Sequence, residues 1–410
     1  MRRLLATALA VAVAAPAAAQ EGPPPTPVPP FGSPSPFPSV LETPRPRDRP
    51  PKVDAAAVAL ADLESGRILY ARRGRQRRPI ASVTKIMTAL LVLEEARPFD
   101  VVTVSARAAA EGGAELGLRA GERVEIRELV FALMLQSAND AAVALAEHVG
   151  GTVGRFVRRM NRRARELGAD RTRFASPNGL DDAGRSTAED LALITAHAFR
   201  TDPFGEIVGT RRHTVPAPRG PDRRIQNRNA LLWLYPGAIG VKTGFTSAAG
   251  FCLVAAAERD GMPLVAVALG SPDEAFSDAA ALLDHGFHAY ERKTLVEEGQ
   301  PVGRIRVAGR PVPVAAGGAA SAVLRPGAEV GHELSAAPGL RLPVRVGAEL
   351  GQLVLVADGR EVGRVPVVAV RAVAAVPPRP PPWWVRLAGA AVELLVRLLL
   401  LPEDRMATGG

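Results

Sequence analysis

Apolar and polar residues recur over residues 53–96 in a pattern that predicts two strands followed by a helix. Residues 55–62 and 67–72 are predicted to form a strand hairpin, with 64–66 as the turn between them. The apolar run 82–96 is rich in Ala, Leu and Met and has the length of a helix. We therefore expect a sheet that contains the hairpin and is covered by this helix.

The pattern continues with helices and then strands up to residue 290. Further helices are predicted over 122–135, 141–149, 153–167, from the capping box at 186–190 onward, and over 275–290. Before the last of these helices, apolar strands are predicted over 238–244, 250–257 and 264–270. This mixture predicts an α/β (α+β) domain over residues 53–292.

The segments on either side of this domain differ from it in composition. Short alternating Val-rich stretches, broken by Gly and Pro, predict a small all-β domain over 293–375. Residues 20–52 are dominated by proline, and we interpret them as a linker. Residues 1–19 combine a basic start, a short apolar stretch and small residues, as in a secretory signal peptide. We therefore expect export to the periplasm or to the outer face of the cytoplasmic membrane.

Residues 376–410 begin with a proline-rich break and continue as an apolar stretch that starts at Trp383 and Trp384. Charged residues interrupt this stretch at spacings of seven and four, so that a helix would carry them on one narrow face. They are Arg386, Glu393 and Arg397. We expect an amphipathic helix that anchors the protein peripherally in the membrane interface. A full span is the alternative, and a charge at mid-helix disfavours it.

Composition and charge narrow the class of protein. The chain has 410 residues, which is room for two domains, and 47% apolar residues, which fits a globular protein. A formal net charge of +9 favours anionic neighbours such as a membrane or wall, but no basic helix interleaved with aromatics marks a nucleic-acid module. Cys252 is the only cysteine, so no intramolecular disulfide can form. None of the six histidines has metal-ligand spacing, and we expect neither a metal nor a cofactor.

The first candidate chemistry is the Ser-x-x-Lys pair Ser82 and Lys85, at the start of the helix predicted over 82–96. Positions i and i+3 share a helix face, which puts the amine beside the hydroxyl. A neutral amine can take the serine proton, and N–H dipoles at a helix start can stabilise an oxyanion. Of the 51 Lys and Arg residues only four are lysine, and Lys85 and Lys242 are two of them. Because arginine does not readily deprotonate, we infer that these positions require an amine. The alternative is that a few lysines persist at any position, as Lys52 and Lys293 illustrate.

Two further motifs follow along the chain. Ser137 and Asn139 lie on a short connection between two predicted helices, where their side chains can project into a cleft. The third motif, on a predicted strand, is Lys242-Thr243-Gly244. A serine and an asparagine on a loop are often helix caps. The order Ser-x-x-Lys, Ser-x-Asn, Lys-Thr-Gly, however, is typical of serine enzymes that act on penicillins.

With these motifs the chain resembles the low-molecular-mass penicillin-binding proteins that act as D-alanyl-D-alanine carboxypeptidases. The likeness extends to the stretches 156–161, 177–180 and 242–250 and covers nearly the whole chain. It implies a β-lactamase/transpeptidase-like domain, with an antiparallel sheet flanked by helices and a helical subdomain, ahead of the small β-domain. It also implies an enzyme that removes the terminal D-alanine from peptidoglycan stem peptides through an acyl-serine and that β-lactams inhibit.

The resemblance assigns roles to the motif residues. It implies that Ser82 is the nucleophile, that Lys85 is its base, and that Ser137 relays a proton to the leaving amine. The backbone N–H groups of Ser82 and Phe245 would form the oxyanion hole. The residues implied in substrate binding are Asn139, Lys242, Thr243, Gly244 and Phe245.

One position departs from the family pattern and keeps alternatives open. Many members place an arginine that helps to recognise the substrate carboxylate where this chain has Ala275. An endopeptidase of the same family is therefore one alternative. A β-lactamase is another; it needs a base for deacylation, and Glu166 and Asp181 lie in the right interval but outside the usual motif. The non-enzyme alternative, a wall-binding scaffold with a relic site, is disfavoured by the two retained lysines.

Overall fold

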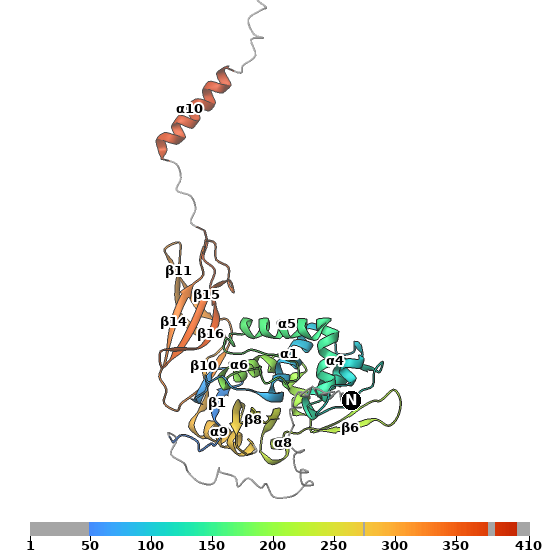
Figure 1. Cartoon of the computed structure of the whole chain (residues 1–410). Helices are drawn as coiled ribbons and strands as arrows, with labels where there is room; N and C mark the ends of the chain where they lie inside the picture. The colour runs from blue at the N-terminus through green and yellow to red at the C-terminus, as the bar shows by residue number, and fades with distance from the viewer. Residues whose placement is uncertain (1–48, 274, 376–381, 400–410) are drawn as a thin grey trace, which may run out of the picture. The chain divides into compact units, whose positions relative to one another are not determined.

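The computed structural model describes residues 49–273, 275–375 and 382–399 (Figure 1). The chain divides into two compact units. Unit 1 holds the residues up to Lys293 together with Val323–Ala328, and unit 2 holds Thr294–Ala322 and the residues from Glu329 onward. The expected signal peptide, residues 1–19, and most of the expected linker lie outside the described residues.

Unit 1 is built around a five-stranded antiparallel sheet in the order β2-β1-β9-β8-β7. Its strands are β1 (Ala57–Asp62), β2 (Ile68–Arg72), β7 (Ala238–Thr246), β8 (Gly250–Arg259) and β9 (Met262–Ser271). Asp260 and Gly261 both adopt positive φ in the tight turn between β8 and β9, as Asp-Gly hairpin turns require. The order of the strands leaves β7 at the edge of the sheet.

Helices and short strands complete unit 1. The helices are α1 (Lys85–Glu95), α2 (Ala106–Ala109), α3 (Ile126–Phe131), α4 (Asn139–Gly150), α5 (Val153–Glu166), α6 (Ala188–Phe199), α7 (Phe204–Gly209), α8 (Leu231–Leu234) and α9 (Phe276–Ala289). Two irregular turns are the 3₁₀ helix η2 (Ala81–Thr84) and the π-helix η3 (Ala132–Gln136). Two-stranded sheets pair β3 (Val101–Thr103) with β4 (Arg123–Glu125) and β5 (Arg212–Val215) with β6 (Arg223–Gln226).

Both faces of the five-stranded sheet are apolar, and helices cover both. Alternate side chains of β1 point to opposite sides: Ala57 and Ala59 belong to one core cluster, and Val58 and Leu60 to the other. The first cluster packs the sheet against the layer that contains α1 and α6, and the second packs it against α9 (Figure 1). The predicted antiparallel sheet flanked by helices is confirmed.

Two predicted helices differ from the observed ones. The helix expected from Ser82 begins at Lys85, because the preceding residues form the 3₁₀ turn η2. The helix expected over 122–135 is wrong at its start, where the chain forms strand β4, and it ends in the π-helix η3. The pairing of β4 with β3 is a tertiary interaction, which local apolar periodicity does not reveal.

Unit 2 is rich in β structure, as predicted for this part of the chain. A five-stranded sheet has the order β11-β12-β16-β15-β14. Its strands are β11 (Pro301–Val307), β12 (Arg310–Ala316), β14 (Val330–Ala336), β15 (Glu349–Ala357) and β16 (Arg360–Ala369). A separate two-stranded sheet contains β10 (Glu291–Val296) and β13 (Ala320–Leu324), and the division of the chain into units falls within both of these strands. Alternating Val, Leu, Ile and Ala side chains of the five strands form one apolar core.

The last described element is the helix α10 (Trp383–Leu399). Its apolar side chains are exposed, Trp383, Trp384 and Leu387 among them. Glu393 and Arg397 form an ion pair of 3.3 Å one helical turn apart. Among the described residues, no helix combines the length and the apolar character needed to cross a bilayer.

Candidate active site

Ser82 and Lys85 lie side by side in the interior of unit 1, with 4% and 0% of their surface exposed. Lys85 Nζ lies 2.8 Å from Ser82 Oγ. The amine also donates to Asn139 Oδ1 at 2.7 Å and to the backbone oxygen of Asn178 at 2.8 Å. With three N–H groups the Lys85 side chain donates to all three oxygens, and a neutral amine in the same place would keep two N–H groups for Asn139 and Asn178 and have a lone pair for the Ser82 proton. Burial also disfavours the ammonium form, so the environment suits an amine that acts as a base.

The turn that presents Ser82 has an unusual backbone. Ala81, which precedes it, has a φ of 47°, in the left-handed region that residues other than glycine rarely adopt. Gly179 packs directly on this turn, because a Cβ at Gly179 would lie 2.0 Å from Ala81 O. Strained backbone of this kind persists where the surrounding structure enforces it, and it gathers at functional sites.

Ser137 ends the π-helix η3 and also has a left-handed φ, of 67°. Its side chain is 2% exposed, and its Oγ has no hydrogen-bond partner among the described residues. A buried hydroxyl without a partner is unfavourable unless another molecule completes its hydrogen bonds. Single-turn π-helices are likewise frequent at functional sites. The hydrogen-bonding capacity of Ser137 Oγ is therefore unused within the described residues.

Asn139 and Asp140 connect this turn to its surroundings. Asn139 begins α4, and its Nδ2 donates to the backbone oxygen of Gly112 at 2.8 Å. The Asp140 carboxylate is buried and accepts successive backbone N–H groups at 2.9 to 3.1 Å. The donors are Leu116, Gly117 and Leu118. The loop between α2 and β4 is thereby fixed against the start of α4, beside Ser137.

The third motif lies on the edge strand β7. Lys242 is 1% exposed, and its Nζ donates to the backbone oxygen of Thr243 at 2.8 Å. Gly244 comes so close to the serine turn that a Cβ would lie 2.9 Å from Ser82 N. Phe245 follows on the same strand. The fold therefore brings all three motifs together, the second through the Asn139–Lys85 hydrogen bond and the third through this close approach.

Sequence reasoning missed two polar groups at this site. Asn178 receives the Lys85 hydrogen bond on its backbone oxygen, and its Nδ2 donates to Glu111 Oε1 at 2.7 Å. Both residues lie on loops that only the tertiary fold brings together. The family-like sequence stretch at 177–180 could have indicated Asn178, whereas no sequence motif indicated Glu111.

The two acidic residues considered as deacylation bases have other roles in the structure. Glu166, at the end of α5, pairs with Arg163, which also binds Glu94 at 2.6 Å. Glu94 lies near the C-terminal end of α1, whereas Lys85 begins this helix, roughly 14 Å away along its axis. Asp181 is exposed and accepts a hydrogen bond within its own loop. The position of Glu166 therefore does not support the β-lactamase alternative.

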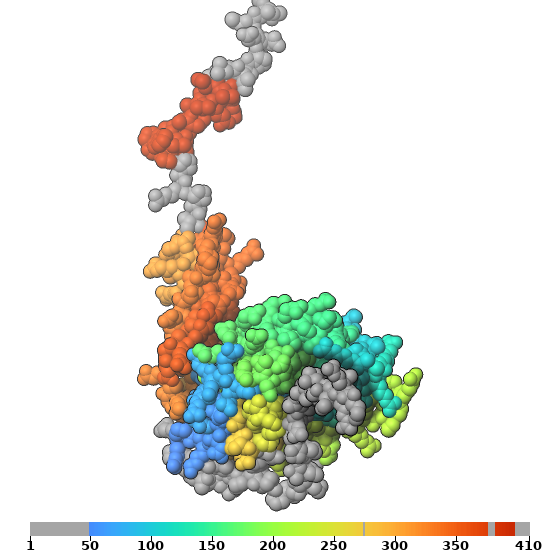
Figure 2. Space-filling model, in the orientation of Figure 1, coloured from blue at the N-terminus to red at the C-terminus, as the bar shows by residue number. Residues whose placement is uncertain are grey.

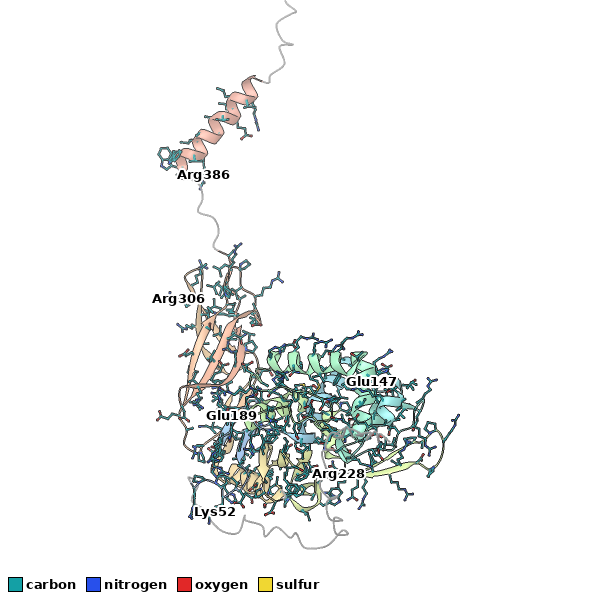
Figure 3. All side chains as sticks on the ribbon, in the orientation of Figure 1. Lys52, Glu147, Glu189, Arg228, Arg306 and Arg386 are labelled. Carbon is teal, nitrogen blue, oxygen red and sulfur yellow. The ribbon has the colours of Figure 1, made fainter. Side chains whose placement is uncertain are left out.

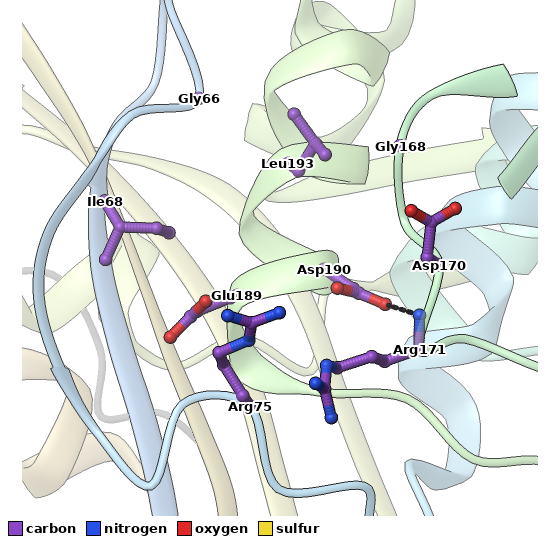
Figure 4. A pocket seen from close by; sticks show the side chains of 9 residues that line it. All are labelled: Gly66, Ile68, Arg75, Gly168, Asp170, Arg171, Glu189, Asp190 and Leu193. Atoms are coloured by element: carbon purple, nitrogen blue, oxygen red, sulfur yellow. Dashed lines mark hydrogen bonds between the residues drawn. The ribbon is translucent and has the colours of Figure 1, made fainter. Parts of the chain in front are cut away.

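A hollow separate from this site lies beside the start of α6 (Figure 4). Its volume is about 220 Å³, and its polar lining includes Arg75, Arg171 and Glu189. Asp190, at its edge, accepts a hydrogen bond from the backbone N–H of Arg171 at 3.0 Å. No residue of the three motifs lines it. Within the described part of the chain, no group of three His, Cys, Asp or Glu side chains is placed to hold a metal ion.

Comparison with known proteins relates this geometry to a family. The sequence model of the S11 peptidases, described as D-alanyl-D-alanine carboxypeptidase, matches residues 45–273. The D-alanyl-D-alanine carboxypeptidase DacF of Bacillus subtilis is 32% identical over 77% of this chain and 85% of its own length. The D-alanyl-D-alanine endopeptidase of Escherichia coli is 29% identical over 65% of this chain and 82% of its own length.

Solved structures agree with this result. Penicillin-binding protein 5 from Haemophilus influenzae matches 80% of this chain and 99% of its own, with a TM-score of 0.66 and 30% identity. The D-alanyl-D-alanine carboxypeptidase DacD from Francisella tularensis matches 82% of this chain and 98% of its own, with a TM-score of 0.61 and 27% identity. The resemblance seen in the sequence is confirmed, and the chain belongs to the D-alanyl-D-alanine carboxypeptidase family of serine peptidases.

Proposed function

We propose that the protein removes the terminal D-alanine from the pentapeptide stems of peptidoglycan through an acyl-enzyme on Ser82. The observation that carries this proposal is the buried pair of Ser82 Oγ and Lys85 Nζ, 2.8 Å apart. The carboxypeptidase family to which the chain belongs supports the substrate class and the reaction with β-lactams.

In acylation, Lys85 takes the Ser82 proton while Ser82 Oγ attacks the carbonyl carbon of the last peptide bond. The C–O bond of an ester forms, and the C–N bond to the terminal D-alanine breaks. Ser137 relays the proton taken by Lys85 to the leaving amine, giving its own proton to the nitrogen and receiving the one from Lys85, a role that its unpartnered buried hydroxyl supports. The backbone N–H groups of Ser82 and Phe245 stabilise the oxyanion, which the close approach of Gly244 to Ser82 N supports.

Substrate binding uses the open edge of the sheet. Because β7 is an edge strand, an extended stem peptide can add beside it and form backbone hydrogen bonds. Lys242 and Thr243 then bind the terminal carboxylate, and Asn139 holds the peptide backbone. Water finally hydrolyses the Ser82 ester and releases the shortened stem.

We also propose that the protein acts outside the cytoplasm and is anchored by α10. Residues 1–19 would direct export and be removed. The exposed tryptophans and leucines of α10, with charged residues at helical spacing, support a helix that lies in the membrane interface.

The catalytic proposal is tested with a fluorescent penicillin on the purified full-length protein. We expect a persistent adduct, located on Ser82 by mass spectrometry and absent from Ser82→Ala. Rapid hydrolysis of the penicillin without an adduct would instead support a β-lactamase. No reaction with the penicillin would support the non-enzyme alternative, a wall-binding scaffold with a relic site.

A second assay separates the two peptidase activities. The protein is incubated with a pentapeptide stem and, separately, with a cross-linked stem dimer. Release of free D-alanine from the pentapeptide is the expected result, whereas cleavage of the dimer alone would assign the endopeptidase activity.

A further inference from the structure

The outer face of α5 carries a single row of arginines. The helix buries Phe156, Met160 and Ala164 in unit 1. The exposed members of the row are Arg155, Arg158, Arg162 and Arg165. At about 100° per residue, the row spans an arc of roughly 80° directly opposite the buried side chains. It extends for about 15 Å along the helix axis.

The arginines beside this row form ion pairs with α1, whereas only one member of the row forms an ion pair within the described residues. Arg159 and Arg163 each approach a glutamate of α1 to 2.6 Å and so tie α5 to α1. Within the row, Arg162 reaches Glu166 at 3.6 Å, with both side chains about half exposed or more. The other three have no ion pair and no side-chain hydrogen bond in the part of the chain that the structure describes.

Such a row is unfavourable for the isolated helix. Like charges three and four residues apart repel each other, and an ordinary solvated face intersperses both signs of charge. α5 instead has six arginines and one glutamate. A guanidinium also binds phosphate oxygens in a bidentate manner, which a lysine ammonium cannot do. Charge and residue type therefore both favour a ligand that carries phosphate groups.

The form of the row favours a linear ligand over a bilayer. In the space-filling view, α5 lies at the surface of unit 1 (Figure 2), and the side chains on its outer face project away from the unit (Figure 3). None of the large apolar side chains exposed among the described residues belongs to α5, whereas α10 has many. A membrane-binding helix inserts such side chains. We propose that the arginine row of α5 docks a linear polyanion with phosphodiester groups along its chain, independently of the catalytic site.

The test measures binding of an end-labelled poly(glycerol phosphate) chain by fluorescence anisotropy at several salt concentrations. Replacing all four row arginines by glutamine should weaken binding at least about tenfold and reduce the log–log salt slope by roughly two to three. The four-lysine variant should retain most of the salt slope but bind more weakly, because charge remains and the bidentate contact is lost. The matched control carries R304Q, R310Q, R345Q and R371Q in unit 2, where all four are exposed, and loses the same charge.

Three outcomes would overturn the proposal. The first is that the control variant loses as much affinity as the row variant, which would show that the loss of affinity depends on net charge alone. A second such outcome is that neither the wild type nor the row variant binds the polyanion at moderate salt. Lastly, the row variant could lose binding to anionic phospholipid vesicles but not to the polyanion, which would make the face a membrane contact. Unchanged thermal unfolding of the row variant would exclude a folding defect as the cause of these outcomes. Unchanged penicillin acylation of the row variant would separate them from a failure of the catalytic assignment.

Discussion

Lys85 Nζ lies 2.8 Å from Ser82 Oγ in a place where both groups are shielded from water. The amine is oriented by two further oxygens, one from the side chain of Asn139 and one from the backbone of Asn178. A histidine is therefore not needed for proton transfer, because a desolvated lysine can supply the base.

The first prediction tests this base. Lys85→Arg keeps a cation but removes a group that can deprotonate, so we expect the acylation rate with a fluorescent penicillin to fall about 10³-fold. Lys293→Arg is the matched control, because Lys293 is exposed on β10. Acylation of Lys85→Arg at close to the wild-type rate would exclude Lys85 as the base.

Ser137→Ala is expected to separate activity from stability. The substitution removes the proton relay proposed for Ser137, so D-alanine release should fall about 10²-fold or more. It also removes a buried hydroxyl that has no partner among the described residues, so stability in urea should stay constant or rise slightly. A large loss of stability would instead indicate that Ser137 has a structural role.

Asp140→Asn is expected to loosen the loop that borders Ser137. The carboxylate accepts the successive N–H groups of Leu116, Gly117 and Leu118, and an amide would direct its own N–H groups at some of these donors. We expect a loss of about 2 to 4 kcal/mol in the free energy of unfolding. Urea denaturation measures it, with Asp170→Asn, at an exposed position, as the control. Equal stability of the two variants would contradict this role.

The elements and the site were predictable to different degrees for physical reasons. The Ser82–Lys85 pair followed from helical spacing, although η2 replaces the first turn of the expected helix. The order of the three motifs indicated the family. The π-helix before Ser137 was not predictable, because apolar periodicity cannot distinguish it from an α-helix over so few residues. Glu111 was missed because it reaches the site from a distant loop.

α10 is expected to bind membranes through its tryptophans. Trp383 and Trp384 are 74% and 59% exposed, so replacing both by alanine should not disturb packing in the described chain. We expect the full-length protein to float with phospholipid vesicles in a density gradient and the double variant to float several-fold less. Arg386→Ala, on the same helix, serves as the control. Equal flotation of wild type and double variant would contradict interfacial insertion of the tryptophans.

Cys252 makes stability depend on pH in the alkaline range. Burial in β8 raises the pKa of its thiol from 9.0 to about 11. The folded state therefore favours the protonated thiol, and this contribution to stability is complete below pH 9 and is lost as pH rises through 11. Near pH 10.5 the wild type should have lost about 2 kcal/mol more than Cys252→Ala, relative to pH 7. Urea unfolding of both proteins at the two pH values measures the difference. Because Tyr235 and Tyr290 also have a raised pKa through burial, both proteins lose stability at high pH, and an equal loss would show that the thiol contributes nothing.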